Sequence, residues 1–316
     1  MVAPGMAENP ATEWFDPRRR KASGLEATRA AELANRLPLI LAKARDIAAS
    51  LVHGAHGRRR AGMGDTFWQY RPFASGEEAQ RVDWRRSARS DQLFVREREW
   101  EAAHNCFVWI DVTASMAFKS ALAHDFKIDR AAVLGLALAD ALVKGGERVG
   151  ALGLSTPTAS RHVMERLAEL FAGEAASDEA SKLPPPVPLP PRARAVLISD
   201  FFCDVEALTA RLSAYSDAGA RGALLMLLDP AEEAFPFAGE TLFRDPLGGE
   251  DFRAGEARAL RDAYGVELEE HKQALREAAR RAGFLFLVHH TDRPAAEAAL
   301  ALLVGLGENA EAPRWA

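Results

Sequence analysis

Short apolar runs alternate with amphipathic helical patterns from about residue 104 onward, and this alternation constrains the fold more than any other feature. The apolar runs predict five strands, at Cys106–Ile110, Arg148–Leu154, Ala195–Ser199, Ala223–Leu228 and Phe284–Val288. Helical patterns lie at 129–143, 160–172, 205–216, 255–281 and 294–304, and residues 235–254 predict irregular or short β structure. Apolar strands that alternate with helices indicate a parallel sheet covered on both faces. We therefore expect an α/β fold with a doubly wound, mostly parallel, Rossmann-like sheet.

The chain divides into four parts by pattern. Residues 1–22 are polar and predict a flexible arm. Residues 23–101 combine a helix with an Arg- and aromatic-rich β element, and the helix is expected over about 28–52 with a break or kink at Pro38. Residues 102–307 hold the α/β domain, and residues 308–316 form a tail.

The Arg-rich block carries ten Arg and no Lys between residues 58 and 98, against six acids. A strand is expected at 92–96 and a turn at 74–77. One interpretation is a compact β element with Trp84 and Phe73 in its core and Arg side chains paired with acids. Others are a protein interface or a surface that binds nucleic acid. The candidate contact residues are Arg71, Arg81, Asp83, Trp84, Arg85 and Arg89.

Composition excludes several classes of protein. The chain is 48% hydrophobic and 27% charged, which argues against a disordered chain. No stretch approaches the ~20 apolar residues of a membrane-spanning helix, and no amino-terminal signal pattern is seen. The two cysteines are too few for a disulfide scaffold, so we expect a cytoplasmic protein.

Oxygen-bearing side chains follow two of the predicted strands. Asp111, Thr113 and Ser115 come after the first strand, and Asp200 comes after the third. Ligands of such sheets bind at the carboxyl ends of the strands, and Mg²⁺ prefers oxygen ligands. The pattern therefore predicts a Mg²⁺ or Mn²⁺ site, although Asp, Ser and Thr are also ordinary loop and helix-cap residues.

Competing sites are less well supported. No glycine-rich dinucleotide loop, phosphate-binding loop or Gly-x-Ser-x-Gly elbow occurs, which argues against those nucleotide enzymes and against α/β-hydrolases. His289 and His290 follow the last strand, where a structural or solvated pair is the better interpretation. A metal-dependent hydrolase on the same oxygen cluster stays open, but two-metal chemistry needs more carboxylates.

The pattern Asp111-x-Thr113-x-Ser115 resembles the metal-ion-dependent adhesion site of von Willebrand factor A domains, with Asp200 matching that family's third-loop Asp. The family's second-loop Thr has two candidates here, Thr156 and Thr158. The upstream submotifs resemble the signature of the bacterial domain of unknown function 58 family. They run Tyr70-Arg71-Pro72-Phe73-Ala74-Ser75-Gly76-Glu77, Arg81-Val82-Asp83-Trp84-Arg85, Ser87-Ala88-Arg89 and Leu93-Phe94-Val95-Arg96-Glu97.

The resemblance implies a function. In that family the block precedes a von Willebrand A-like domain, and the genes commonly neighbour those of MoxR-type AAA+ ATPases. It therefore implies a non-enzymatic, Mg²⁺-dependent adaptor or co-chaperone that works with such an ATPase on a client protein. Members often carry amino-terminal membrane helices, which are not seen in this sequence.

Overall fold

The computed structural model describes residues 26–57, 67–73, 82–88, 92–98, 103–177, 180–244 and 251–311. The chain separates into two compact units. One comprises residues 1–53 and 104–316, and the other comprises residues 54–103. Each unit is described by itself below.

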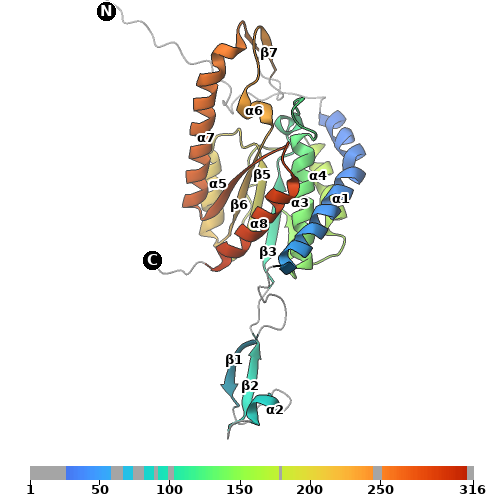
Figure 1. The fold of residues 1–316 in the computed structure, drawn as a ribbon, viewed down its shortest axis with the longest axis vertical. Coiled ribbons are helices and arrows are strands. Elements are labelled where there is room, and N and C mark those ends of the chain that lie inside the picture. Colours follow the sequence, from blue (N-terminus) through green and yellow to red (C-terminus); the bar gives the residue numbers. More distant parts are fainter. Residues whose placement is uncertain are drawn as a thin grey trace, which may run out of the picture. The chain divides into compact units, whose positions relative to one another are not determined.

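The larger unit is built on five parallel strands (Figure 1). They are β3 (Asn105–Ile110), β4 (Arg148–Ala151), β5 (Arg194–Ser199), β6 (Arg221–Leu228) and β9 (Phe284–His290). Their order across the sheet is β4-β3-β5-β6-β9, and every neighbouring pair is parallel. The doubly wound α/β prediction is confirmed. β4 ends earlier than expected because the chain turns back after Ala151 and pairs Thr158 with Val149.

Helices cover both faces of this sheet (Figure 1). One face carries α1 (Glu26–Gly57), α3 (Lys127–Lys144), α4 (Val163–Ala175) and α8 (Ala295–Glu311). The other carries α5 (Val205–Asp217) and α7 (Arg261–Arg281). Short elements lie between them: η3 (Ala114–Ala117), α6 (Pro230–Ala234), β7 (Thr241–Phe243), β8 (Phe252–Ala254) and η4 (Ala257–Leu260). Among the helices described, none is long and apolar enough to cross a bilayer.

Alternate side chains of the strands are buried in two separate hydrophobic cores, one on each face of the sheet. On β3, Val108 and Ile110 join the core under α1, α3, α4 and α8, whereas Phe107 and Trp109 join the core under α5 and α7. A strand places successive side chains on opposite faces, so a strand buried on both faces must be apolar throughout. This geometry is the physical reason for the uninterrupted apolar runs in the sequence.

Helix α1 runs without interruption through Pro38, so of the two expectations for that position the break is wrong. Proline costs one backbone hydrogen bond and a steric clash, roughly 3 kcal/mol in a helix interior. The apolar stripe of α1 offsets this cost, because Leu33, Ile40, Ala44 and Leu51 are all buried in the core of the larger unit. For the same reason α1 groups with the α/β domain and not with the Arg-rich segment. Helix α7 continues through Gly265.

The smaller unit contains an antiparallel hairpin of β1 (Phe67–Pro72) and β2 (Phe94–Arg98), with one helical turn, α2 (Trp84–Ser87). The expected strand at 92–96 is confirmed with a shift of two residues. Trp84 is 61% exposed, so its expected place in a core is wrong. A single turn buries only one side, and here Ser87 occupies that side. Phe73 is half-buried, and the predicted turn at 74–77 lies outside the described residues.

Candidate functional site

The strand order of the sheet places its switch point between β3 and β5. From β3 the chain crosses first to the edge strand β4, and it then returns to the other side of β3 as β5. Loops leave neighbouring strands in opposite directions at such a point, and ligands bind in the crevice that this opens. Asp111 directly follows β3 and Asp200 directly follows β5, so both lie at this switch point. The sequence-predicted oxygen cluster therefore lies where the topology favours a ligand.

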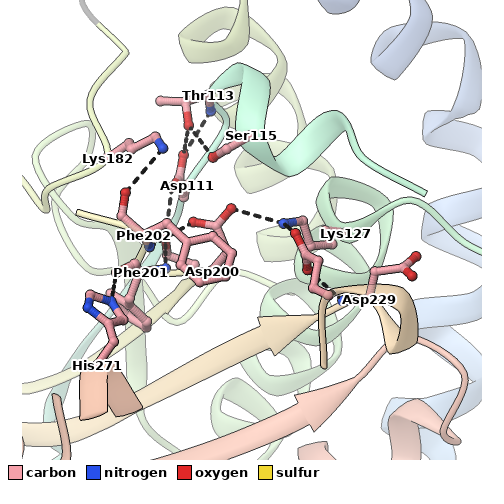
Figure 2. A network of polar contacts seen from close by, with 12 residues as sticks. Asp111, Thr113, Ser115, Lys127, Lys182, Asp200, Phe201, Phe202, Asp229 and His271 are labelled. Atoms are coloured by element: carbon pink, nitrogen blue, oxygen red, sulfur yellow. Dashed lines mark hydrogen bonds and ion pairs between the residues drawn. The ribbon is translucent and has the colours of Figure 1, made fainter. Parts of the chain in front are cut away.

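Asp111 is fully buried and is surrounded by hydrogen-bond donors (Figure 2). Its Oδ1 accepts from the Thr113 backbone N at 2.8 Å and from Thr113 Oγ1 at 2.6 Å. Its Oδ2 accepts from Ser199 Oγ at 2.7 Å. Thr113 Oγ1 lies 3.2 Å from Ser115 Oγ. The tight turn into η3 thus brings the predicted residues Asp111, Thr113 and Ser115 together.

Asp200 is equally buried, but its main partner is a cation (Figure 2). Lys127, at the start of α3 and only 1% exposed, donates from Nζ to Asp200 Oδ2 at 3.0 Å. The other oxygen, Oδ1, accepts from the Phe202 backbone N at 3.1 Å. The Lys127 ammonium also lies 5.7 Å from the ring centroid of Phe118 and 5.5 Å from that of Phe202. Both oxygens of Asp200 are therefore engaged by the protein.

A third carboxylate completes the surroundings of Lys127. Glu232 Oε1 accepts from Lys127 Nζ at 2.5 Å, while Glu232 Oε2 accepts from the Asp229 backbone N at 2.8 Å. Asp229 in turn caps α6 and accepts from the Ser120 backbone N at 2.8 Å. The Glu232 side chain thus links the Lys127 ammonium to the backbone at the start of α6. We call Asp111, Thr113, Ser115, Lys127, Ser199, Asp200 and Glu232 the carboxyl-edge site.

The two strand-end aspartates differ in acidity. Burial, and then the nearby charge of Asp200, raises the pKa of Asp111 above its usual range despite the hydrogen bonds from Thr113 and Ser199. Burial also acts to raise the pKa of Asp200, but the Lys127 ammonium outweighs it, and that pKa lies below its usual range. Burial acts to lower the pKa of Lys127, and its two carboxylate partners raise it instead. Asp200 and Lys127 are therefore a charged pair, while Asp111 has no cation in contact among the described residues.

Of the two candidate second-loop threonines, Thr158 lies away from Asp111. Thr158 pairs with Val149 of β4, and Val149 lies in register with Cys106 of β3. Cys106 is five residues before Asp111, which is roughly 16 Å along a strand. The loop that contains Thr156 and Thr158 therefore folds back along β4, and Thr158 lies away from Asp111.

The candidate contact residues of the smaller unit have varied positions. Asp83 caps α2 by accepting from the Arg86 backbone N at 3.0 Å, and Trp84 and Arg85 are exposed. Arg71 lies in β1, in register with Val95 of β2. Arg81 and Arg89 lie outside the described residues.

Sequence reasoning missed Lys127, Ser199 and Glu232 as members of the site. Lys127 carries a usable signal, because it stands in the first turn of a helix, where the helix dipole disfavours a positive charge. A lysine in the first turn of a largely buried helix indicates a carboxylate partner from another element. Ser199 and Glu232 carry no comparable signal, since both fit ordinary strand-end and helix-cap patterns.

A family model described as "protein of unknown function DUF58" matches residues 69–274. The chain belongs to this family. The matched segment of this DUF58 protein begins in β1 and runs into α7, so it includes every residue of the carboxyl-edge site.

Two solved structures are similar to this DUF58 chain. One is an aerotolerance-related membrane protein from Bacteroides fragilis NCTC 9343, at 16% identity and a TM-score of 0.40. The other is the conserved hypothetical protein BatB from Bacteroides thetaiotaomicron, at 12% identity and a TM-score of 0.36. Each comparison covers 65% of this chain and 100% of the other. No curated protein sequence matches this chain.

Proposed function

We propose that this DUF58 protein is a protein-interaction module whose carboxyl-edge site binds a divalent cation, Mg²⁺ or Mn²⁺, and through it an acidic side chain of a partner. The observation that carries the proposal is the convergence of Asp111, Thr113 and Ser115 oxygens beside Asp200 at the switch point of the sheet. These are hard oxygen donors of the kind that Mg²⁺ prefers, and few enough to leave coordination positions open.

The electrostatics of Asp111 support a cation. An ionised carboxylate that is fully buried is costly unless a cation or several donors compensate it. Asp111 has donors from Thr113 and Ser199, but the nearest ammonium contacts Asp200 instead. A divalent ion between Asp111, Thr113 and Ser115 would supply the missing positive charge, with Asp200 close enough to join through a water.

The same donor set favours docking over hydrolysis. Two-metal hydrolysis needs several carboxylates that hold two ions a few ångströms apart. Within the described ranges, no group of three or more His, Cys, Asp and Glu side chains is arranged to hold a metal. Two aspartates with hydroxyls suit one ion and an exchangeable ligand, and we propose that this ligand is the partner's carboxylate.

We propose two partners from the resemblance to von Willebrand A-containing members of the family. The first to test is a MoxR-type AAA+ ATPase, and the second is a client protein. Trp84 supports a further contact on the smaller unit, because an exposed tryptophan beside exposed Arg85 is typical of an interface anchor. The adaptor would then bind one protein through the metal and another through the Arg-rich hairpin.

Calorimetry with Mg²⁺ and Mn²⁺ tests the metal. We expect Asp111→Asn to abolish binding, since it removes the charge and keeps the shape. Asp204→Asn is the matched control: Asp204 caps α5 only four residues from Asp200, and Asn caps helices equally well. Equal metal affinity in Asp111→Asn and the wild type would overturn the proposal.

A pull-down with the ATPase, with and without EDTA, tests the docking role. We expect capture to require the metal and to be lost in Asp111→Asn. Trp84→Ala should weaken the second contact without changing the melting temperature, because its side chain is exposed. Binding of single- or double-stranded nucleic acid that falls steeply with salt, and is lost in Trp84→Ala, would assign the hairpin to nucleic acid instead.

A further inference from the structure

The central sheet has two edge strands, β4 and β9, and the chain closes the edge of β4 with its own residues. On β4 the backbone groups of Val149 and Ala151 face away from β3. Val149 exchanges two backbone hydrogen bonds with Thr158, each at 2.9 Å. The Ala151 N donates to Ser155 Oγ at 3.0 Å, and the Ala151 carbonyl accepts from the Ser155 backbone N at 2.9 Å. The outer backbone groups of this short strand are therefore satisfied within the chain.

The outer edge of β9 has no such cover in the part of the chain that the structure describes. Thr291, just past the strand, donates from its backbone N to β6 at 3.0 Å. Backbone groups alternate in direction along a strand, so those of Phe284, Phe286 and Val288 face away from β6. No described residue forms a hydrogen bond with these outer groups. Residues 285–288 are also partly exposed, whereas β6 is buried at all but its first residue.

The strand lacks the usual protection of a free edge. Natural sheets protect such an edge with a short strand, a Lys, a Pro or a bulge. β9 is seven residues long, has the sequence Phe-Leu-Phe-Leu-Val-His-His, and pairs with β6 without a shift of register. The Arg276 guanidinium lies 5.6 Å from the ring centroid of Phe286, where it covers a face of the sheet and not its edge. The edge of β9 is therefore available to another strand.

We propose that β9 pairs in antiparallel fashion with β9 of a second copy of this chain. The two five-stranded sheets would then join into one continuous sheet across a twofold axis at Leu287. This inference goes beyond the proposed function and does not rest on it, because the carboxyl-edge site takes no residue from β9.

The sequence of β9 is complementary to itself in this register. With Leu287 at the axis, Phe286 lies opposite Val288 of the second copy, and such pairs of aromatic and β-branched side chains are favourable. Both residues turn their backbone groups outward, so each of these pairs exchanges two hydrogen bonds. Phe284 lies opposite His290, and no two acids or two strong bases meet. Since β4 is closed, the pairing uses the open edge of each sheet and ends at a dimer.

Sedimentation velocity of the full chain over a range of concentrations tests the pairing. A seven-residue edge is a small interface, so we expect a monomer–dimer equilibrium that depends on concentration. Val288→Pro removes a backbone donor that β6 does not use, and an edge strand tolerates proline in that orientation. It should weaken dimerisation at least about tenfold, because two hydrogen bonds are lost across the axis. Val288→Ala keeps the donor and is the matched control, with a clearly smaller effect.

Cross-linking tests the register. The backbone groups of Leu287 face β6, so the two copies of Leu287 form a non-hydrogen-bonded pair with Cα atoms about 4.5 Å apart. This separation suits a disulfide, and Leu287→Cys should give a covalent dimer on oxidation. Leu285→Cys is the control, since its two copies would lie ~14 Å apart along the strands. The native Cys106 and Cys203 are buried and should not react.

The outcomes separate a second copy from other partners. A wild type that stays monomeric at every concentration would overturn the proposal, as would equal weakening by Val288→Pro and Val288→Ala or no cross-link in Leu287→Cys. A monomer that captures a different protein, and loses it in Val288→Pro, would assign the edge to that protein instead. If Val288→Pro does not fold, hydrogen exchange of the wild type decides. The Phe286 and Val288 amides should become protected as the concentration rises, and amides that stay unprotected would overturn the pairing.

Discussion

Two regions at the carboxyl edge of the same sheet differ in whether their buried polar groups have hydrogen-bond partners. At the ends of β3 and β5, Asp111 and Asp200 are buried with hydroxyl, amide and ammonium partners. At the end of β9, His289 and Thr291 are also buried, but His289 Nε2 and Thr291 Oγ1 have no hydrogen-bond partner in the described part of the chain. The first region buries aspartates together with an ammonium group, and the second buries a histidine and a threonine hydroxyl beside Arg130.

The difference in acidity follows from these surroundings. Burial, and then the charge of Arg130, lowers the pKa of His289 to about 4, so the ring is neutral at pH 7. Arg130 itself is held by the Thr291 carbonyl at 2.8 Å and by Asp125 at 3.0 Å. A buried, neutral histidine fits a structural role, whereas at the other region the Lys127 ammonium holds Asp200 as a charged group.

The largest expected effect is on stability after Lys127→Met. Breaking a buried ion pair by removing one partner typically costs 3–5 kcal/mol, because the other charge stays buried. We expect a loss of about that size in urea denaturation at pH 7, and a clearly smaller loss in Lys127→Arg. A loss below ~1 kcal/mol would mean that the two carboxylates can become neutral or reach solvent, and the contrast between the regions would be weakened.

The next largest effect is a dependence of the free energy of unfolding on pH, which we expect from His289 at the end of β9. A histidine whose folded pKa lies below its unfolded value stabilises the fold above the unfolded pKa, and this contribution is lost as the pH falls through that value toward the folded pKa. For His289, with a pKa shifted from 6.5 to about 4, the free energy of unfolding should fall by about 2 kcal/mol between pH 7 and pH 5. His289→Gln should remove this part of the dependence in denaturation curves at both pH values. An unchanged slope would show that His289 is not the titrating group.

A smaller loss of folding stability is expected for Ser199→Ala. Ser199 Oγ donates to Asp111 Oδ2 at 2.7 Å and accepts from the Phe201 backbone N at 2.9 Å. Removing it leaves a buried amide and a buried carboxylate each short of one partner, which costs about 1–3 kcal/mol. Ser50→Ala is the control, since Ser50 donates to Asp46 O on the exposed side of α1 and should change stability by less than ~0.5 kcal/mol. Equal effects in both variants would contradict the hydrogen bonding described for Asp111.

The smallest effect is expected for Thr291→Val. The Thr291 hydroxyl is fully buried and has no partner in the described residues, so replacing it with a methyl group removes an unsatisfied polar atom. Thermal denaturation should show a free energy of unfolding that is unchanged or larger by up to ~1 kcal/mol. A loss above 1 kcal/mol would reveal a bound water or another partner for this hydroxyl, and the end of β9 would then resemble the ends of β3 and β5.

The sequence predicts the fold well because a sheet buried on both faces leaves a strong pattern. The five strands are visible as apolar runs, the helices α3, α4, α5, α7 and α8 are visible as helical patterns, and Asp111 and Asp200 are found by their place after a strand. Pro38 misled the prediction because local propensity favours a break, and only the tertiary packing of Leu33, Ile40 and Leu51 reveals the continuous helix.

Lys127 and Trp84 show the limits of sequence patterns. The ion pairs of Lys127 span 73 and 105 residues, and no local pattern encodes such separations. One interpretation of the Arg-rich block placed Trp84 in a core, but a four-residue turn has too little surface to cover it. Local patterns thus predict which elements form, whereas contacts between distant elements decide which polar groups share a site.

The long separations within the carboxyl-edge site have a consequence for folding. Ser199 and Asp111 are 88 residues apart, and Glu232 joins only after β6. Closing loops of this length costs entropy that local contacts cannot repay, so such contacts form late. A chain that has reached only β4 during synthesis holds Asp111 and Thr113 but neither Asp200 nor Glu232. Under the proposed function, binding of a partner would require that β3, β5 and α6 have come together, so a chain that ends at β4 would not compete for the partner.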